Sequence, residues 1–165
     1  MTQVLRAAAL SAVLCLTLLA SGCGFRLQAA SALPEGVSRV HVATRDELSP
    51  FAVELFQGLE DMGARRAASA GEADAVIRVQ KERAGRRVLS VSARNTPQEY
   101  EVFYQVAYSI DRGGSEVVPR QQLELTRNFS FDESRLLAKD REEEILRDAM
   151  ARDLADLVLR RLGSL

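Results

Sequence analysis

The sequence predicts an α+β two-layer sandwich, in which two helices pack on one face of a four-stranded mixed sheet. Two observations lead to this fold class. Segments that alternate polar and apolar residues, as half-buried strands do, occur once near position 40 and then three times between positions 75 and 131. Apolar residues at helical spacing occur between the first two strands and again after the last one. The order β-α-β-β-β-α is typical of helices gathered on one face of a sheet.

The first strand and the first helix are predicted between positions 39 and 63. Arg39–Ala43 alternates as a strand does. Ser49 and Pro50 are typical of a helix start, because a hydroxyl caps free N–H groups and proline suits the first helical position. Gly63 is the predicted C-cap. The apolar face between them must pack on the sheet and comprises Ala52, Leu55, Phe56, Leu59 and Met62.

Two of the long strands are predicted to form a hairpin. Ala75–Arg83 and Arg86–Arg94 are interpreted as halves of one strand, broken by a bulge at Ala84–Gly85. Tyr100–Ile110 alternates most clearly, with aromatic and aliphatic residues on one face and polar residues on the other. Arg112–Ser115 has the composition of a tight turn into the next strand.

The last strand places Leu123, Leu125, Phe129 and Phe131 on one face, and Arg127 falls unexpectedly among them. Pro119 near its start predicts an edge position or a bulge. Asp140 and Glu143 have the spacing of a capping box, so the second helix is predicted to begin at Asp140. Its apolar stripe comprises Leu146, Ala149, Met150, Leu154, Leu157 and Val158.

The N-terminus has the layout of a secretory signal peptide. Arg6 precedes an apolar run, and Ser21 and Gly22 stand directly before Cys23, which resembles the bacterial lipobox. We therefore expect residues 1–22 to be a lipoprotein signal peptide, residues 23–36 a lipidated tether, and residues 37–165 a single domain. The alternative is an ordinary cleaved signal followed by a chance cysteine.

The lipobox resemblance implies that Cys23 carries a diacylglycerol and an N-linked acyl chain such as palmitate. Two or three acyl chains form a firm anchor, since each buried methylene contributes ~0.8 kcal/mol. Gly24 stands where an aspartate would signal inner-membrane retention, so we expect the outer membrane, on its periplasmic side. Cys15 leaves with the signal, so no thiol remains for a disulfide or a metal site.

The sequence offers no residues patterned for catalysis. His41 is the only histidine and has no nucleophile or acid patterned around it, and no Gly-rich phosphate loop or metal-ligand spacing occurs. Glu142–Glu144 suits a helix N-terminus better than paired acid catalysis. The formal net charge of −1 becomes −2 without Arg6, which does not favour a nucleic-acid partner. We predict a protein that is not an enzyme and binds no metal and no cofactor besides its lipid.

Basic residues cluster between Arg78 and Arg94, and Arg86 and Arg87 stand at the centre of the cluster. Such charge can simply keep an exposed edge strand soluble. In the outer-membrane periplasm, however, the abundant phosphorylated ligand is lipopolysaccharide, and arginines bind phosphate through charge-assisted hydrogen bonds. The predicted location in the periplasm therefore favours binding of lipopolysaccharide by this basic cluster.

The mature chain resembles the LPS-assembly lipoprotein LptE (RlpB) family of Gram-negative bacteria. The residues that carry this resemblance are Gly22–Leu27, Glu99–Tyr100, Arg127–Phe129, Leu137–Asp140, Met150, Asp153 and Arg160–Leu162. The family implies the same fold of two helices on a four-stranded sheet.

The resemblance also implies a function. LptE-type lipoproteins plug the outer-membrane β-barrel LptD, help it assemble, and are proposed to bind lipopolysaccharide through basic residues. Lys139 and Arg94 match two such basic positions, whereas Arg86 and Arg87 are added here from charge clustering alone. Two alternatives stay open: an auxiliary outer-membrane lipoprotein of another envelope lipid-transport complex, and an envelope hydrolase.

Overall fold

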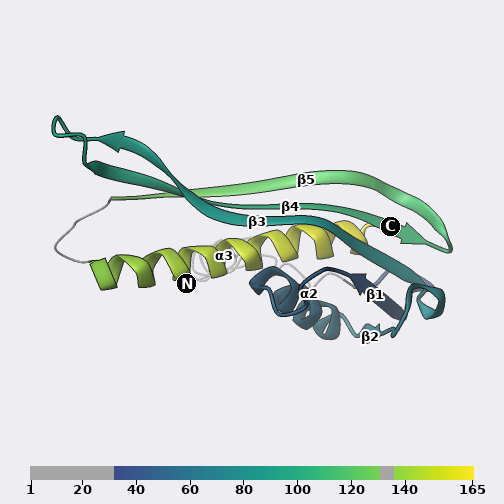
Figure 1. Cartoon of the computed structure of the whole chain (residues 1–165). Helices are drawn as coiled ribbons and strands as arrows, with labels where there is room; N and C mark the ends of the chain where they lie inside the picture. The colour runs from purple at the N-terminus through teal and green to yellow at the C-terminus, as the bar shows by residue number, and fades with distance from the viewer. Residues whose placement is uncertain (1–31, 131–135) are drawn as a thin grey trace, which may run out of the picture. The chain divides into compact units, whose positions relative to one another are not determined.

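The computed structural model describes residues 32–130 and 136–165, and of residues 130 and 136–139 it describes the backbone alone (Figure 1). The predicted signal, Cys23, most of the tether and Phe131 lie outside the described residues. The elements in chain order are β1 (Arg39–Ala43), α2 (Pro50–Asp61), β2 (Arg65–Arg66), the 3-10 helix η1 (Ala70–Glu72), β3 (Ala75–Val91), β4 (Pro97–Arg112), β5 (Ser115–Ser130) and α3 (Leu136–Gly163).

The α+β class, the two helices and the mixed sheet are confirmed, but the sheet has five strands rather than four. Its order is β2-β1-β3-β4-β5. β1 runs parallel to β2 and β3, whereas β3, β4 and β5 are antiparallel neighbours. The unpredicted strand, β2, consists of two exposed arginines that pair with Arg39 and Val40. A segment this short cannot show an alternating pattern.

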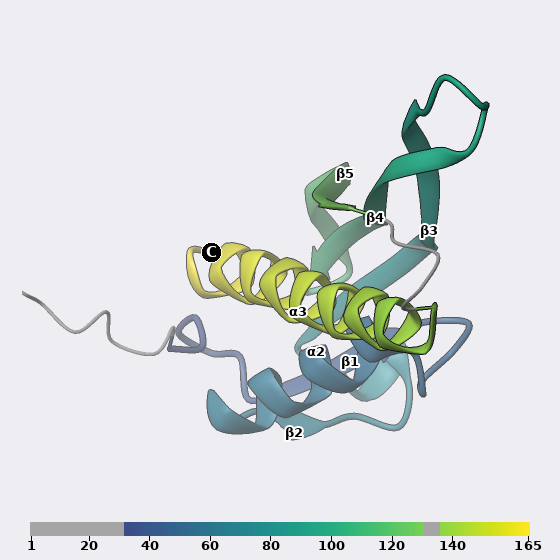
Figure 2. The same ribbon diagram turned by 90° about the vertical axis from the view of Figure 1, so that its left-hand side faces the viewer.

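Both helices pack on one face of the sheet, and the core lies between the two layers (Figures 1 and 2). β4 supplies the centre of this core through alternate side chains, all of them buried: Val102, Tyr104, Val106, Tyr108 and Ile110. Phe51 and Leu55 of α2 and Met150 and Leu154 of α3 meet them with no exposed surface. The predicted apolar faces of both helices therefore point into one core, except that Ala149 and Leu157 of the α3 stripe are exposed.

The predicted limits of the first helix are confirmed. Ser49 is the N-cap, and its Oγ accepts a hydrogen bond from the Ala52 backbone N–H at 3.2 Å. Pro50 is the first helical residue, and Gly63 follows the C-cap with a φ of 83°. A left-handed residue at this position is favoured when it is glycine, which carries no Cβ.

Ala75–Val91 forms one strand, but Ala84–Gly85 is not a bulge. The register shifts lie elsewhere, between Val79 and Lys81 and again between Val88 and Val91. Gly85 pairs directly with Phe103, and a Cβ on Gly85 would lie 3.0 Å from the Phe103 ring. The glycine therefore makes room for an aromatic ring on the neighbouring strand.

β5 confirms two expectations and explains the odd placement of Arg127. The register with β4 shifts between Val118 and Gln121, so Pro119 lies at a bulge, and β5 ends the sheet. Arg127 lies on the helix-facing side, where its guanidinium is 3.5 Å from the Asp153 carboxylate of α3. The tight turn before β5 contains Gly113 and Gly114, both at positive φ as a two-residue hairpin turn requires.

The second helix begins earlier than predicted, at Leu136 instead of Asp140. Asp140 is therefore not its N-cap, and Lys139 lies in the first turn of α3 rather than in a loop before it. The capping-box spacing misled because Asp140 and Glu143 lie inside a helix that begins one turn earlier. Leu137 and Ala138 are good helix formers and extend the helix backwards.

Asp74 holds the start of β1 against the start of β3. Its carboxylate accepts hydrogen bonds from the backbone N–H groups of Ser38 and Arg39 at 3.0 and 2.8 Å and from the Ser38 hydroxyl. These backbone hydrogen bonds, helped by the Arg39 charge, lower the pKa of Asp74 from its usual 3.8 to about 2. The ionised form is thus favoured in the folded protein.

We expect Asp74→Asn to lower the melting temperature at neutral pH and to flatten its acid dependence. A carboxyl whose pKa is lowered by folding stabilises the protein above its unfolded pKa, and this stabilisation disappears as the pH falls from about 4 towards 2. Melting curves across this range measure the effect. The matched control is Asp61→Asn, an exposed carboxyl whose side chain makes no hydrogen bond or ion pair within residues 32–130 and 136–165. The prediction would be wrong if the melting temperatures of the wild type and Asp74→Asn fell equally as the pH is lowered.

Candidate functional site

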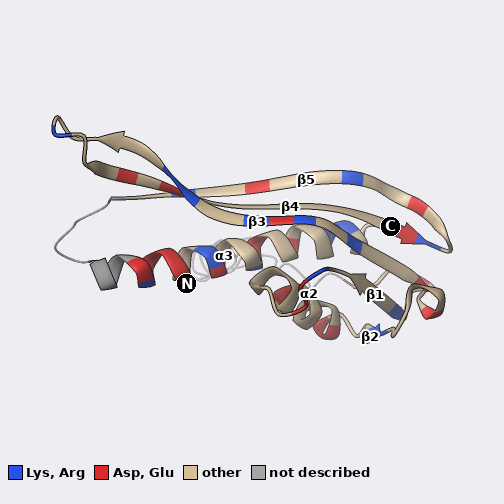
Figure 3. Cartoon of the chain, viewed as in Figure 1, with Lys and Arg blue, Asp and Glu red and all other residues tan. Residues whose placement is uncertain are grey.

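The basic residues of β3 do not form one continuous basic surface. Acidic and basic residues are interspersed along β3, β4 and β5 (Figure 3). Arg78 binds Asp111 of β4 at 2.8 Å, Arg86 binds Glu143, and Arg87 binds Glu101. Half of the basic residues in this cluster are therefore paired with carboxylates of β4 or α3.

Arg86 lies on the helix-facing side of the sheet and joins β3 to α3. Its Nη1 donates to the Glu143 carboxylate at 2.8 Å, and its guanidinium stacks over the Tyr100 ring, 5.0 Å from the ring centre. Arg147, one turn later on α3, donates to the other oxygen of Glu143. Glu143 is only 4% exposed, and a buried carboxylate needs partners of this kind. An open depression of about 410 Å³ lies beside the cluster.

Arg87 lies on the opposite face of the sheet. It donates to the carboxylates of Glu101 on β4 and Glu124 on β5, and it stacks over the Phe103 ring at 5.3 Å. The hydrogen bond to Glu101, followed by the attraction of both carboxylates, raises the pKa of Arg87 above its usual value. This side chain ties three strands together.

Arg94 lies at the end of the β3–β4 hairpin, which projects beyond the helices (Figure 2). We call Val88–Thr96 the hairpin tip. Arg94 is exposed, and its side chain makes no hydrogen bond or ion pair in the part of the chain that the structure describes. Three large apolar side chains of the tip are also exposed, Val88 at 49%, Leu89 at 46% and Val91 at 51%. The tip thus combines an available cation with apolar surface.

Two other candidate residues are Lys139 and Cys23. The backbone of Lys139 belongs to the first turn of α3, and its side chain lies outside the described residues. Cys23 lies outside them altogether. The N-terminal end of α3 and the hairpin tip lie at the same end of the sheet (Figure 1).

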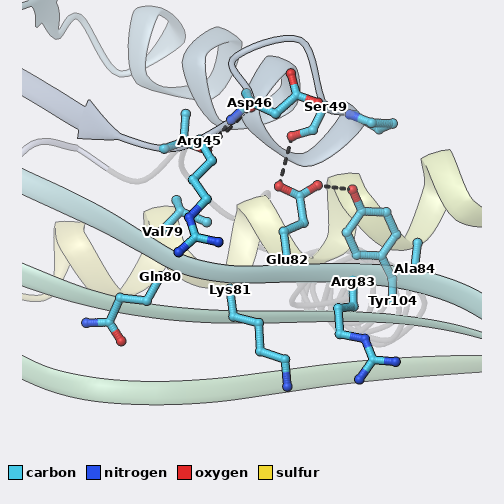
Figure 4. Close-up of a pocket in the computed structure, with 12 residues that line it drawn as sticks. Arg45, Asp46, Ser49, Val79, Gln80, Lys81, Glu82, Arg83, Ala84 and Tyr104 are labelled. Atoms are coloured by element: carbon cyan, nitrogen blue, oxygen red, sulfur yellow. Dashed lines mark hydrogen bonds between the residues drawn. The ribbon is translucent and has the colours of Figure 1, made fainter.

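A cavity of about 540 Å³ was not predicted from the sequence. It lies between the loop after β1, the start of α2 and the middle of β3 (Figure 4). At one side, the Glu82 carboxylate accepts hydrogen bonds from the hydroxyls of Ser49, at 2.9 Å, and Tyr104. The Tyr104 hydroxyl accepts from the Phe51 N–H at 3.3 Å. Burial, followed by the bond to Glu82, raises the pKa of Tyr104 above its usual range. A long-range pairing of this kind leaves no local sequence signal.

The described residues contain no group of three or more side chains suited to holding a metal ion. His41 is half-buried, and its Nδ1 lies 3.1 Å from the Ala67 carbonyl oxygen. None of the helices in residues 32–130 and 136–165 is long and apolar enough to cross a membrane.

Comparison with known proteins gives one family and a set of solved structures. A family model described as "LptE: Lipopolysaccharide-assembly" matches residues 37–162. The solution structure of lipoprotein B from Nitrosomonas europaea is 28% identical, with a TM-score of 0.72, and the match covers 86% of this chain and 92% of that one. No curated protein matches the chain.

Two further structures share the fold at lower identity. Rare lipoprotein B from Shewanella oneidensis is 24% identical with a TM-score of 0.68, over 77% of this chain and 95% of that one. A minor lipoprotein from Acinetobacter baumannii is 19% identical with a TM-score of 0.64, over 79% and 94% of the two chains.

Proposed function

The chain belongs to the LptE lipopolysaccharide-assembly family, and we therefore propose that it is an outer-membrane lipoprotein that binds lipopolysaccharide and plugs the LptD β-barrel. The family match over residues 37–162 is the observation that carries this proposal, because it spans nearly the whole described domain. The similar structure from Nitrosomonas europaea is itself described as a lipoprotein. The role is one of binding and assembly rather than of catalysis.

The hairpin tip supports the lipopolysaccharide part of the proposal. Lipid A carries phosphates next to acyl chains, so a protein that binds it needs cations beside apolar surface. Arg94 and the exposed side chains of Val88, Leu89 and Val91 offer this combination. Lys139 lies in the helix turn at the same end of the sheet.

Arg86 and Arg87 receive a different role in this proposal. Each is bound to carboxylates and stacked on an aromatic ring, so recruiting it for phosphate would take the arginine partner from Glu101 or one of the two arginines from Glu143. Removing part of the compensation of a buried carboxylate is costly, and Glu143 is the more buried of the two. We assign both arginines to holding the hairpin in place, and the ligand contacts to Arg94 and Lys139.

We expect the double variant Arg94→Glu, Lys139→Glu to bind lipopolysaccharide about a hundredfold more weakly and to remain folded. Each charge-assisted hydrogen bond contributes about 1.5–3 kcal/mol, which is roughly tenfold or more in affinity. A negative charge in the first turn of α3 also suits the helix dipole, so the melting temperature should not fall. Fluorescence titration with lipopolysaccharide and thermal melting measure the two quantities on the same sample.

The matched control reverses two other exposed arginines, Arg120 on β5 and Arg160 on α3. This control has the same change of net charge and should bind lipopolysaccharide like the wild type. Equal weakening in both double variants would show that net charge decides the affinity, and unaltered binding by the first variant would remove Arg94 and Lys139 from the site.

The barrel partner is tested by purification through a C-terminal tag in mild detergent. Recovery of a large heat-modifiable β-barrel of the LptD type supports the proposal. Recovery of an inner-membrane ATPase complex instead would favour an auxiliary lipoprotein of another lipid-transport system.

A further inference from the structure

β3 continues past the end of β1 and leaves one position in the sheet without a strand. β1 pairs with β3 only over Ala75–Arg78, whereas β3 runs on to Val91. Beyond Arg78, none of the other described strands lies on this side of β3. The backbone N–H and C=O groups along this edge can therefore pair with an added strand.

The 540 Å³ cavity lies at this position. It is lined by Thr44–Asp46, which directly follow β1, and by Val79–Ala84, which directly follow the paired part of β3. The start of α2 at Ser49 and Pro50 closes the helix-facing side (Figure 4). The cavity is thus in line with β1, in the place where a longer β1 would have continued.

Three basic side chains border the cavity without an acidic partner. Arg45 reaches from the loop after β1 towards β3, while Lys81 and Arg83 point away from α2, to the other side of β3 (Figure 4). No ion pair of these three is found in the part of the chain that the structure describes, although Arg78 and Arg87 of the same strand each bind a carboxylate.

The carboxylates beside the cavity already have partners. Glu82 accepts hydrogen bonds from the hydroxyls of Ser49 and Tyr104, and Asp46 accepts one from the Leu48 N–H at 2.9 Å. The three basic side chains that line the cavity therefore outnumber its two carboxylates, and neither carboxylate is used in an ion pair with them within the described residues. Acidic side chains on an added strand would lie next to Lys81 and Arg83 as cross-strand neighbours.

We propose that this vacant strand position binds an extended acidic segment of a partner protein by β-strand addition to β3. Main-chain hydrogen bonds to Val79–Ala84 supply the affinity. Specificity comes from the side chains of the added strand, which point alternately to the two faces of the sheet. Acidic residues of the segment face Lys81 and Arg83, and small apolar residues face the helix side, where Val79 and Tyr104 line the cavity. The site is separate from the hairpin tip, and its failure would leave the lipopolysaccharide proposal intact.

The competing explanation is edge protection. Basic side chains and bulges on an edge strand discourage pairing with other chains, and β3 has a register shift between Val79 and Lys81. Edge protection predicts that no peptide binds, so the two explanations give opposite results.

The test uses the mature full chain in mild detergent and three labelled seven-residue peptides. One alternates glutamate and valine, one alternates lysine and valine, and the third is the acidic peptide with alternate backbone nitrogens methylated. We expect saturable binding of the acidic peptide by fluorescence anisotropy and slower hydrogen exchange at Val79–Ala84. The lysine peptide should not bind, and methylation should weaken binding about tenfold or more, because it removes main-chain hydrogen bonds.

The triple variant Arg45→Glu, Lys81→Glu, Arg83→Glu should bind the acidic peptide at least about tenfold more weakly. A matched triple reversal at exposed sites elsewhere, Arg120, Arg141 and Arg160, should bind it like the wild type.

Four results would overturn the proposal. They are no binding of the acidic peptide, equal binding of the acidic and basic peptides, protection along Ser115–Ser130 of β5 instead of β3, and unweakened binding of the methylated peptide. The last result, together with competition by inorganic phosphate, would identify a simple anion site.

Discussion

Replacing Val106 with aspartate is expected to unfold the domain. Val106 lies in the middle of β4 with no exposed surface, between Glu82 of β3 and Leu123 of β5 in the sheet register. Its side chain points into the core shared by the sheet and both helices. An unpaired carboxylate there costs several kcal/mol, and the total stability of a domain is about 5–15 kcal/mol.

Circular dichroism during thermal and urea unfolding measures this effect. The matched control is Val117→Asp, the same change at a β5 valine that is 40% exposed, and it should alter stability by about 0.5 kcal/mol or less. A Val106→Asp protein that melts like the wild type would show that this face of β4 does not form the core.

Replacing Cys23 with serine is expected to abolish acylation and to release the protein from the membrane. We propose that the Cys23 thiol carries the lipid, because Ser21 and Gly22 precede it as in a lipobox. A single acyl chain holds a protein only marginally, whereas two or three hold it firmly, since each buried methylene contributes ~0.8 kcal/mol. Loss of the thiol removes all of them at once.

Labelled palmitate incorporation and membrane fractionation, in cells that lack the barrel partner, measure the outcome. Cys15→Ser is the matched control, because we expect Cys15 to leave with the signal, and this variant should be acylated and retained. The folded domain is unchanged in Cys23→Ser, so binding to the partner should persist. If unacylated Cys23→Ser stayed in the outer membrane, the proposal that acyl chains on Cys23 anchor the protein would be wrong.

Local patterns in the sequence determined most of the architecture. The alternation of Tyr100–Ile110 identified β4, because burial of one sheet face imposes a period of two on the chain itself. Ser49-Pro50, Gly63 and the paired glycines of the β4–β5 turn marked element ends, because caps and tight turns depend on the residues at those positions. The family resemblance likewise followed from short blocks in order, and the family model confirms it.

The partners of each charge were decided by the tertiary structure alone. Arg86 and Arg87 are neighbours in a basic run, yet they lie on opposite faces of the sheet and bind Glu143 of α3 and Glu101 of β4. A sequence gives the spacing of charges along one chain, but pairing depends on which strands and helices meet in space. Arg94 differs from both because the hairpin carries it beyond those elements.

The same reason explains the other features that sequence reasoning missed. β2 exists because two arginines lie beside Arg39 and Val40 once α2 has folded back, and Gly85 is required by a ring on the neighbouring strand rather than by its own turn. The vacant position beside β3 results from the early end of β1, a difference in length between two strands that are about 30 residues apart in the chain. Local sequence fixes the elements and their buried faces, because periodicity is a property of consecutive residues. The ion pairs, the close approach at Gly85 and the free edge arise between distant segments, so only the folded structure decides them.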